Sequence, residues 1–247
     1  MVAIQCITYN HEPYIRDALE GFVMQKADFP FVAIVHDDAS TDNTAEIVKE
    51  YAAKYPDIIL PIYEEENQYS KRDGSLSHLL HITLNYTRAK YIALCEGDDY
   101  WIDPLKLQKQ VDFLESHPNY GMCYTKAKYF FQGNNQFTDI FGGPNETFEQ
   151  FLMANTVPTL SAVFRHDIQS KYHKEIQPQS KKWSMGDYPL WLFFSHESKI
   201  KLIDNVTGVY RILPNSASHF DKSQYKQQLN FLKSSFDVSL YYMREYP

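Results

Sequence analysis

Short apolar runs alternate with amphipathic stretches through the first half of the chain. The runs are rich in Val and Ile, which is typical of buried strands, whereas the stretches between them repeat apolar residues every three or four positions, as helices do. A strand followed by a helix is therefore the expected repeating unit. We expect strands at 2–9, 31–37, 58–65 and 91–96, and helices at 13–25, 43–55, 76–89 and 103–117.

Residues typical of helix starts support these boundaries. Asn43 and Glu46 have the spacing of a capping box, and Asp103 followed by Pro104 is a common N-cap and first turn. A strand and helix alternation of this kind predicts an α/β fold whose central sheet is mostly parallel and covered by helices. Such sheets bind their ligands at the carboxyl ends of the strands.

The regular alternation ends near residue 119. The second half has fewer clear repeats, a polar loop that contains glycine, and a helical pattern close to its end. We expect strands at 121–131 and 159–165, a loop at 132–145, helices at 147–155 and 188–196, and two strands or one bent strand at 199–211.

Composition narrows the class of protein. With 247 residues, of which 44% are hydrophobic, the chain can bury the core of one domain. The net charge of -7 and the lack of a Lys and Arg cluster argue against binding to nucleic acid. Cys6, Cys95 and Cys123 lie in apolar runs without zinc-site spacing, so we expect buried thiols in a reducing compartment. No apolar run is long enough for a transmembrane segment and no signal-peptide pattern opens the chain, so we expect a cytoplasmic location.

Acidic side chains follow two of the expected strands. Asp37 and Asp38 end the second strand, and the segment 96–99, Glu-Gly-Asp-Asp, follows the fourth. Close carboxylates repel each other unless protons or a cation offset their charge. A magnesium or manganese ion would do so together with phosphate oxygens, which predicts a phosphorylated substrate, and Gly97 would let the backbone approach it. The alternative is that both segments are ordinary turns before capped helices.

Three segments resemble the family 2 glycosyltransferases of the GT-A fold as an ordered set. They are CITYNHEPYIRDALEGFVMQ (6–25), VHDDASTDNT (35–44) and YIALCEGDDYWIDPLKLQKQ (91–110). The resemblance covers residues 2–117 well and the second half more thinly. It implies a Rossmann-like GT-A domain that binds a nucleotide-sugar donor.

The resemblance assigns donor contacts by position in the first half, residues 1–118. Thr8 and Tyr9 correspond to residues that line the nucleotide base and ribose, and Asp38 corresponds to the acceptor for the base's ring N–H. The family often places an Arg for the pyrophosphate in the helix that here reads SHLLHITLN, which has none. Lys71 or Arg72 could take its place, with a solvated charge pair as the alternative.

Glu96, Asp98 and Asp99 occupy the place of the family's metal-binding DxD motif, and the implied cofactor is Mn²⁺ or Mg²⁺. Glu96 is longer than the usual Asp. We therefore expect Asp98 and Asp99 to bind the metal, Asp98 to contact the donor as well, and Glu96 to face the ribose or a metal-bound water. His219, in NSASHF, resembles a late metal-binding His of several GT-A enzymes, with a plain surface histidine as the alternative.

The second half, residues 119–247, would bind the acceptor and supply the catalytic base. Asp187 in WSMGDYPLW resembles the carboxylate of the family's ED-type motif, with Gly186 in place of the Glu. A base in this position would take the proton of the attacking hydroxyl. The alternative is a helix N-cap. Trp183, Tyr188 and Trp191 could add aromatic surface for a sugar acceptor, with core packing as the alternative for Trp191.

These features predict an inverting, metal-dependent glycosyltransferase. It would move a sugar from a UDP-linked or related donor to a hydroxyl of a glycan or lipid-linked saccharide, as in cell-surface polysaccharide synthesis, and could touch the inner membrane face peripherally. A sugar-phosphate nucleotidyltransferase would open with a Gly-rich loop and a basic residue, which ITYNHEPY lacks. A non-catalytic sugar-nucleotide or glycan-binding module would keep Asp38 and lose Asp187.

Overall fold

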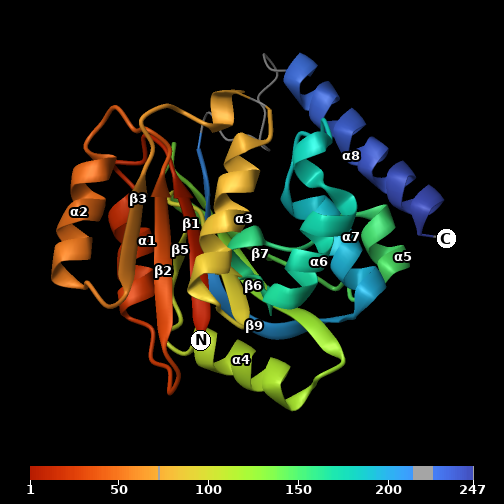
Figure 1. Cartoon of the computed structure of the whole chain (residues 1–247), viewed down its shortest axis with the longest axis horizontal. Helices are drawn as coiled ribbons and strands as arrows, with labels where there is room; N and C mark the ends of the chain where they lie inside the picture. Colours follow the sequence, from red (N-terminus) through yellow and green to blue (C-terminus); the bar gives the residue numbers. More distant parts are fainter. Residues whose placement is uncertain (72, 214–224, 247) are drawn as a thin grey trace.

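A nine-stranded sheet runs through the whole molecule, with helices on both of its faces (Figure 1). The computed structural model describes residues 1–71, 73–213 and 225–246. The strands follow the order β3-β2-β1-β4-β8-β6-β9-β5, and β7 pairs with β6 outside this path. The sheet therefore continues from the first half of the chain into the second.

The first half forms the predicted parallel alternation. β1 lies between β2 and β4, and β3 pairs with the other edge of β2, all in parallel. In this register Thr8, the last residue of β1, lies opposite Asp37, the last residue of β2. The strands are β1 (Val2–Thr8), β2 (Phe31–Asp37), β3 (Ile59–Tyr63) and β4 (Tyr91–Leu94), and the helices are α1 (Ile15–Val23), α2 (Thr44–Lys54), α3 (Ser75–Thr87) and α4 (Lys106–Ser116).

The second half extends the sheet with strands of both directions. β8 (Val163–Arg165) is antiparallel to β4 and to β6 (Tyr120–Phe131), whereas β9 (Lys199–Ile212) is parallel to β6. β9 is a single strand whose pairing with β6 has irregularities, which matches the expected bent strand. The helices are α5 (Phe148–Met153), α6 (His166–Ile176), α7 (Asp187–Glu197) and α8 (Tyr225–Glu245).

Several elements differ from the sequence prediction. β7 (Gln136–Phe141) lies in the expected loop and is almost wholly exposed, so it has no buried apolar face to mark it. β5 (Tyr100–Trp101) is too short to show a period. Helix α6 buries His, Gln and Tyr beside one Ile, which hides its helical apolar pattern. The expected strand at 159–165 begins only at Val163, after a 3₁₀ turn.

Two predicted caps are wrong. Asn43 precedes α2, but its side chain makes no capping bond and instead donates to Glu12 Oε1 at 2.7 Å. Helix α4 begins at Lys106, three residues after Asp103, whose Oδ1 accepts the N–H of Leu105 at 2.9 Å. The pairings that replace these caps tie neighbouring loops together.

The core has one apolar layer on each face of the sheet. α1, α2 and α4 pack on one face, and α3, α6 and α7 pack on the other, with α5 and α8 outside α7 (Figure 1). Helix α7 is apolar on all sides because it lies between the sheet and α8. Tyr188 and Trp191 are buried there and belong to the core rather than to a sugar-binding surface. The three cysteines are buried free thiols.

Candidate active site

The loops that follow β1, β2 and β4 meet at the carboxyl edge of the sheet. The N–H of Asp38 donates to Thr8 O at 2.9 Å, and the N–H of Gly97 donates to Ile7 O at 2.8 Å. β1 thus joins both acidic segments through its backbone. The three segments that carry the sequence resemblance are neighbours in space.

Gly97 is required by the side chains around it. A Cβ at this position would lie 2.6 Å from Thr8 Oγ1, 2.7 Å from Thr8 Cβ and 3.1 Å from His11 Nδ1. These distances leave no room for any larger residue. Packing against Thr8 and His11 is therefore a reason for this glycine in the fold itself, and the approach of a ligand to its backbone stays a prediction.

Three polar atoms near this glycine are buried without a hydrogen-bond partner. They are Thr8 Oγ1, His11 Nδ1 and Glu96 Oε2. Buried polar groups are almost always paired, so each exception needs an explanation. Burial lowers the pKa of His11, although the charges of Asp98 and of other aspartates act in the opposite direction. The group of unpaired atoms is what a site prepared for a polar ligand would leave.

The carboxyl groups of 96–99 bear the cost of burial and of mutual repulsion. Burial, and then the charge of Asp98, raise the pKa of Glu96 to about 7. The charge of Asp187 is a smaller cause that acts in the same direction. Burial also raises the pKa of Asp99 well above its ordinary value, and Asp98 and Glu96 add to the effect. The carboxyl groups of this short segment thus disfavour one another's charged forms.

Asp98 and Asp99 differ in what holds them. Asp99 is 2% exposed, and its Oδ1 accepts the backbone N–H of Arg211 at 2.7 Å. Asp98 is half-buried, and no described residue donates to its carboxylate, although its backbone O accepts Arg211 Nε at 2.7 Å. Asp98 is therefore the aspartate of this pair that is free to meet a ligand.

The acidic segment fits a hard divalent ion only in part. Within the described residues, no three His, Cys, Asp or Glu side chains are arranged as a complete metal site. Magnesium and manganese sites commonly use one or two carboxylates with water and substrate phosphate oxygens. The free carboxylate of Asp98 and the unpaired Glu96 Oε2 fit that arrangement. His219, also predicted as a metal ligand, lies outside the described residues.

The aspartates that end β2 are saturated by the protein itself. Asp37 accepts the N–H and the hydroxyl of Ser40. Asp38, 1% exposed, accepts the N–H groups of Gln68 and Tyr69 at 2.6 and 3.0 Å. The predicted base contact, Asp38, thus anchors the segment that follows β3.

Two further predicted donor contacts are described and one is not. Tyr9 is 42% exposed beside this edge, so its ring is accessible. Lys71 donates to Gln68 Oε1 at 3.0 Å and forms an ion pair with Glu66 at 3.2 Å, which is the charge-pair alternative. Arg72 lies outside the described residues.

Asp187 does not cap α7. The N-cap is Gly186, and Asp187 is the first helical residue. Its Oδ2 accepts Asn155 Nδ2 at 3.2 Å and Thr159 Oγ1 at 3.1 Å. The helix-cap alternative is therefore wrong, and two side chains from the segment between α5 and β8 hold this carboxylate in place.

Sequence reasoning missed the residues that support the acidic groups. His11, Asn155, Thr159 and Arg211 had no assigned role, and their side chains become adjacent to the carboxylates only through the fold. The one available signal was a single Arg in the apolar run VYRIL.

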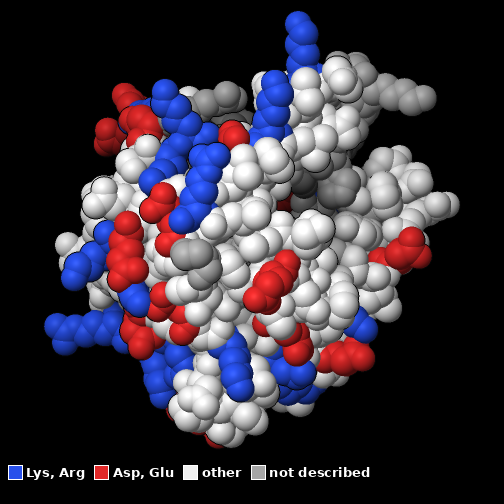
Figure 2. All heavy atoms as spheres, turned by 90° about the vertical axis from the view of Figure 1, so that its right-hand side faces the viewer, with Lys and Arg blue, Asp and Glu red and all other residues white. Residues whose placement is uncertain are grey.

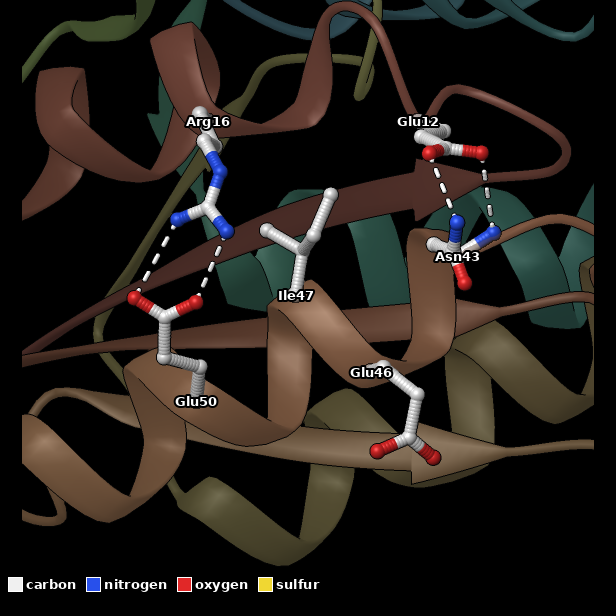
Figure 3. A pocket seen from close by; sticks show the side chains of 6 residues that line it. All are labelled: Glu12, Arg16, Asn43, Glu46, Ile47 and Glu50. Carbon is white, nitrogen blue, oxygen red and sulfur yellow. Dashed lines mark hydrogen bonds and ion pairs between the residues drawn. The ribbon is translucent and has the colours of Figure 1, made fainter.

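A shallow pocket between α1 and α2 lies apart from this site (Figure 3). Its volume is about 420 Å³, and its polar lining is largely paired. Arg16 forms an ion pair with Glu50 at 2.7 Å, and Glu12 accepts two N–H groups of Asn43. These pairs brace the loops after β1 and β2, so we assign the pocket a structural role.

Curated relatives match from about half to nearly all of the chain. An uncharacterized protein of Mycobacterium tuberculosis is 39% identical over 167 residues, which are 66% of this chain and 46% of that protein. An uncharacterized glycosyltransferase of Methanocaldococcus jannaschii is 27% identical over 93% of this chain and 76% of its own length. The minor teichoic acid biosynthesis protein GgaB of Bacillus subtilis is 30% identical over 45% of this chain and 12% of its own length. The chain spans about half the length of the first of these relatives.

Solved structures share the fold at low sequence identity. S. aureus TarS 1-349 in complex with UDP matches with a TM-score of 0.63 and 18% identity, over 96% of this chain and 72% of that one. The mannosyltransferase PcManGT from Pyrobaculum calidifontis, in complex with GDP-Man and Mn²⁺, matches with a TM-score of 0.66 and 17% identity, over 97% of this chain and 64% of that one. The predicted α/β fold of the GT-A type is confirmed.

The family model for "Glycosyl transferase family 2" matches residues 4–168, which are 165 of the 247 residues. The matched range contains all three segments on which the sequence resemblance rests. The prediction of a glycosyltransferase is thereby confirmed at the level of the family. The chain belongs to glycosyl transferase family 2.

Proposed function

We propose that the chain transfers a sugar from a nucleoside diphosphate donor, UDP-linked in the first instance, to a hydroxyl of a glycan or lipid-linked saccharide, with inversion at the anomeric carbon. One observation carries the proposal. Acidic side chains gather after β4 at the carboxyl edge of the sheet, beside Thr8 Oγ1, His11 Nδ1 and Glu96 Oε2, which are buried without hydrogen-bond partners. The UDP in the TarS structure and the Mn²⁺ in the PcManGT structure support the choice of nucleotide and metal.

The first half, residues 1–118, would bind the donor. Thr8, the last residue of β1, and Tyr9, which follows it, would line the nucleotide, and Asp38 fixes the neighbouring segment with its two backbone bonds. Asp98, with Asp99 behind it, would hold Mn²⁺ or Mg²⁺. When bound, such an ion would offset the negative charge of the leaving diphosphate. The pKa of Glu96 is raised to about 7, so its carboxyl group can keep a proton near neutral pH. The protonated group could donate a hydrogen bond to an oxygen atom of the nucleotide-sugar.

The second half, residues 119–247, would supply the base. Direct displacement needs a carboxylate that takes the proton of the acceptor hydroxyl as it attacks. Asp187 meets this need because Asn155 and Thr159 both bind its Oδ2, which leaves Oδ1 free of hydrogen bonds from the described residues. A base held by neighbouring groups loses less conformational freedom when the substrate binds.

A lipid-linked acceptor would require contact with a membrane, and α8 offers a surface for it. No helix among the described residues is long and apolar enough to cross a bilayer. Much of the side formed by α5, α7 and α8 carries no charged side chains (Figure 2). An amphipathic helix with flanking cations can lie in the interface of an anionic bilayer. Exposed apolar residues at helical spacing are Tyr225, Leu229, Leu232, Phe236 and Met243, with Lys226, Lys233 and Arg244 beside them.

A nucleotide panel tests the proposed donor. UDP, GDP, dTDP and CMP would each be added with and without Mn²⁺, and the melting temperature measured. A ligand that binds only the folded state raises its stability by mass action. We expect the largest shift with UDP and Mn²⁺ together, and release of free UDP when a UDP-sugar and an acceptor are supplied. Equal shifts with EDTA would contradict the metal site, and nucleotide binding without turnover on any acceptor would favour a binding module.

A further inference from the structure

Arg211 lies at the end of β9 and connects segments that are far apart in the sequence. It is only 5% exposed. Its Nε donates to Asp98 O at 2.7 Å, its Nη1 to Gln132 Oε1 at 2.8 Å and its Nη2 to Asp17 Oδ2 at 2.6 Å. Its backbone N–H donates to Asp99 Oδ1 at 2.7 Å. One residue of the second half thus binds two consecutive residues of the acidic segment.

Aromatic rings enclose the guanidinium. Its central carbon lies 4.9 Å from the ring centre of Tyr14, 5.2 Å from that of Tyr100 and 5.5 Å from that of Phe130. Rings in these positions attract the cation and keep water away from its hydrogen bonds. Because all three nitrogens are engaged and covered, Arg211 is poorly placed to bind a phosphate directly.

The acidic segment needs such a support. Three carboxyl groups lie within four residues here; the N–H of Gly97 donates to Ile7 O, and Asp98 and Asp99 are held by Arg211. Arg211 holds the backbone of Asp98 and the side chain of Asp99, yet it leaves the carboxylate of Asp98 free. The carboxylate of Asp98 thus stays available to the donor, as does the unpaired Glu96 Oε2.

We propose that Arg211 is a positioning residue that keeps Asp98 and Asp99 in the arrangement that receives the donor, and that it ties β9 of the second half to the donor site. The predicted effect on nucleotide binding rests on the proposed function. The contacts of Arg211 with Asp98 and Asp99 do not depend on that function. A loosened segment would bind nucleotide and metal more weakly while the chemical groups remain present.

Arg165 provides a matched control. Its Nε donates to Tyr120 O at 2.9 Å, its Nη1 to Tyr91 Oη at 3.2 Å and its Nη2 to Leu114 O at 2.6 Å. Like Arg211, Arg165 makes three side-chain hydrogen bonds, but none of them goes to a residue of the acidic segment 96–99. A variant of Arg165 therefore shows how much stability the fold loses when a comparable arginine is removed elsewhere.

The test compares Arg211→Gln, Arg211→Lys and Arg165→Gln with the wild type. Hydrogen exchange of the amides in 96–101 and the Kd for UDP with Mn²⁺, by calorimetry, are measured on each. We expect Arg211→Gln to speed exchange in this segment and to raise the Kd, each by about tenfold, the effect of one charged hydrogen bond. Arg211→Lys keeps the charge and the stem, so it should fold and recover part of the affinity.

The outcomes separate the two proposals. Arg165→Gln should lower the melting temperature and leave both readouts within about twofold of the wild type. Unchanged exchange in 96–101 after Arg211→Gln, or equal changes in Arg165→Gln, would overturn the positioning role. A wild type that does not bind UDP would count against the proposed donor, while the exchange rates would still decide whether Arg211 holds the segment.

Discussion

Two aspartate pairs stand at equivalent places beside β1, one after β2 and one after β4. The protein itself satisfies Asp37 and Asp38, since Ser40 and the backbone of 68–69 donate to their oxygens. The pair after β4 is different, because the carboxylate of Asp98 accepts nothing from the described residues and Asp99 accepts one backbone N–H. The number of hydrogen-bond donors around an acidic pair therefore separates acids that hold loops from acids that await a ligand.

The difference also has an energetic side. Carboxylates that accept hydrogen bonds stabilise the fold, whereas buried carboxylates without partners destabilise it. Active sites commonly contain groups of the second kind, with shifted pKa values. On this comparison we propose that the segment 96–99 and Asp187 serve the reaction, whereas the hydrogen bonds of 37–38 hold neighbouring loops.

The largest effect is expected at Asp187. We expect Asp187→Asn to lower the transfer rate by about 10²–10⁴-fold, the usual contribution of a positioned base. UDP binding should stay unchanged, because the donor residues lie in the first half. The rate of UDP release in the presence of acceptor, the Kd for UDP and the melting temperature would be measured on one preparation.

Asp187 is not the N-cap of α7, so this substitution leaves the helix start intact. Asn can still accept a hydrogen bond from Asn155 or Thr159. A variant that transfers sugar at the wild-type rate would remove Asp187 from the chemistry.

We expect a substitution in the pair Asp37 and Asp38 to lower the stability of the fold. Asp38→Ala removes two charge-assisted hydrogen bonds to the backbone of 68–69, and we expect it to lower the free energy of unfolding by about 2–4 kcal/mol. Urea unfolding measures this change. Equal stability of Asp38→Ala and the wild type would break the distinction between the two pairs.

We expect Glu96 to make the free energy of unfolding depend on pH with the opposite sign to that of a hydrogen-bonded carboxylate. Its folded pKa of about 7 lies above the ordinary value, so the folded state holds a proton that the unfolded state has lost. The stability of the wild type should therefore fall as the pH rises from about 4.5 to 7. Glu96→Gln should remove this part of the fall and be more stable at pH 7.5, by about 1–3 kcal/mol.

Melting curves of the wild type and Glu96→Gln from pH 4.5 to 8, without nucleotide or metal, would measure this pH dependence. Parallel curves for Glu96→Gln and the wild type across this range would mean that Glu96 is ionised without penalty.

Asp98 should have the smallest effect on the fold. Because its carboxylate makes no hydrogen bond to the described residues, we expect Asp98→Ala to change the free energy of unfolding by less than about 1 kcal/mol, or to raise it by relief of repulsion. The comparison with Asp38→Ala by urea unfolding is direct. A loss as large as that of Asp38→Ala would show that both pairs serve the scaffold.

Much of the fold could be predicted from the sequence because its elements follow strong periods. β1, β2 and β4 of the first half are largely buried and therefore read as continuous apolar runs. The sequence pattern did not predict β7 and α6, because β7 is exposed and α6 buries polar side chains. Their formation depends on partners far along the chain, which a local pattern does not record.

The site divided in the same way. Its acidic residues lie in motifs that the sequence displays, after β2 and β4 and at the start of α7, and their roles in the site stay predictions. The donors to these acids could not be predicted. Arg211 lies more than a hundred residues from Asp98 and Asp99, and the bonds of Asp38 come from backbone N–H groups, which every residue type carries.

The most direct test of the account is the binding of UDP with Mn²⁺ to the wild type, Asp98→Asn and Asp37→Asn, measured by calorimetry. The account predicts clear binding to the wild type, a Kd raised about tenfold or more in Asp98→Asn, and a Kd within about threefold of the wild type in Asp37→Asn. Equal affinity in Asp98→Asn and the wild type, or a larger loss in Asp37→Asn, would contradict the claim that the unpaired acids after β4 receive the donor.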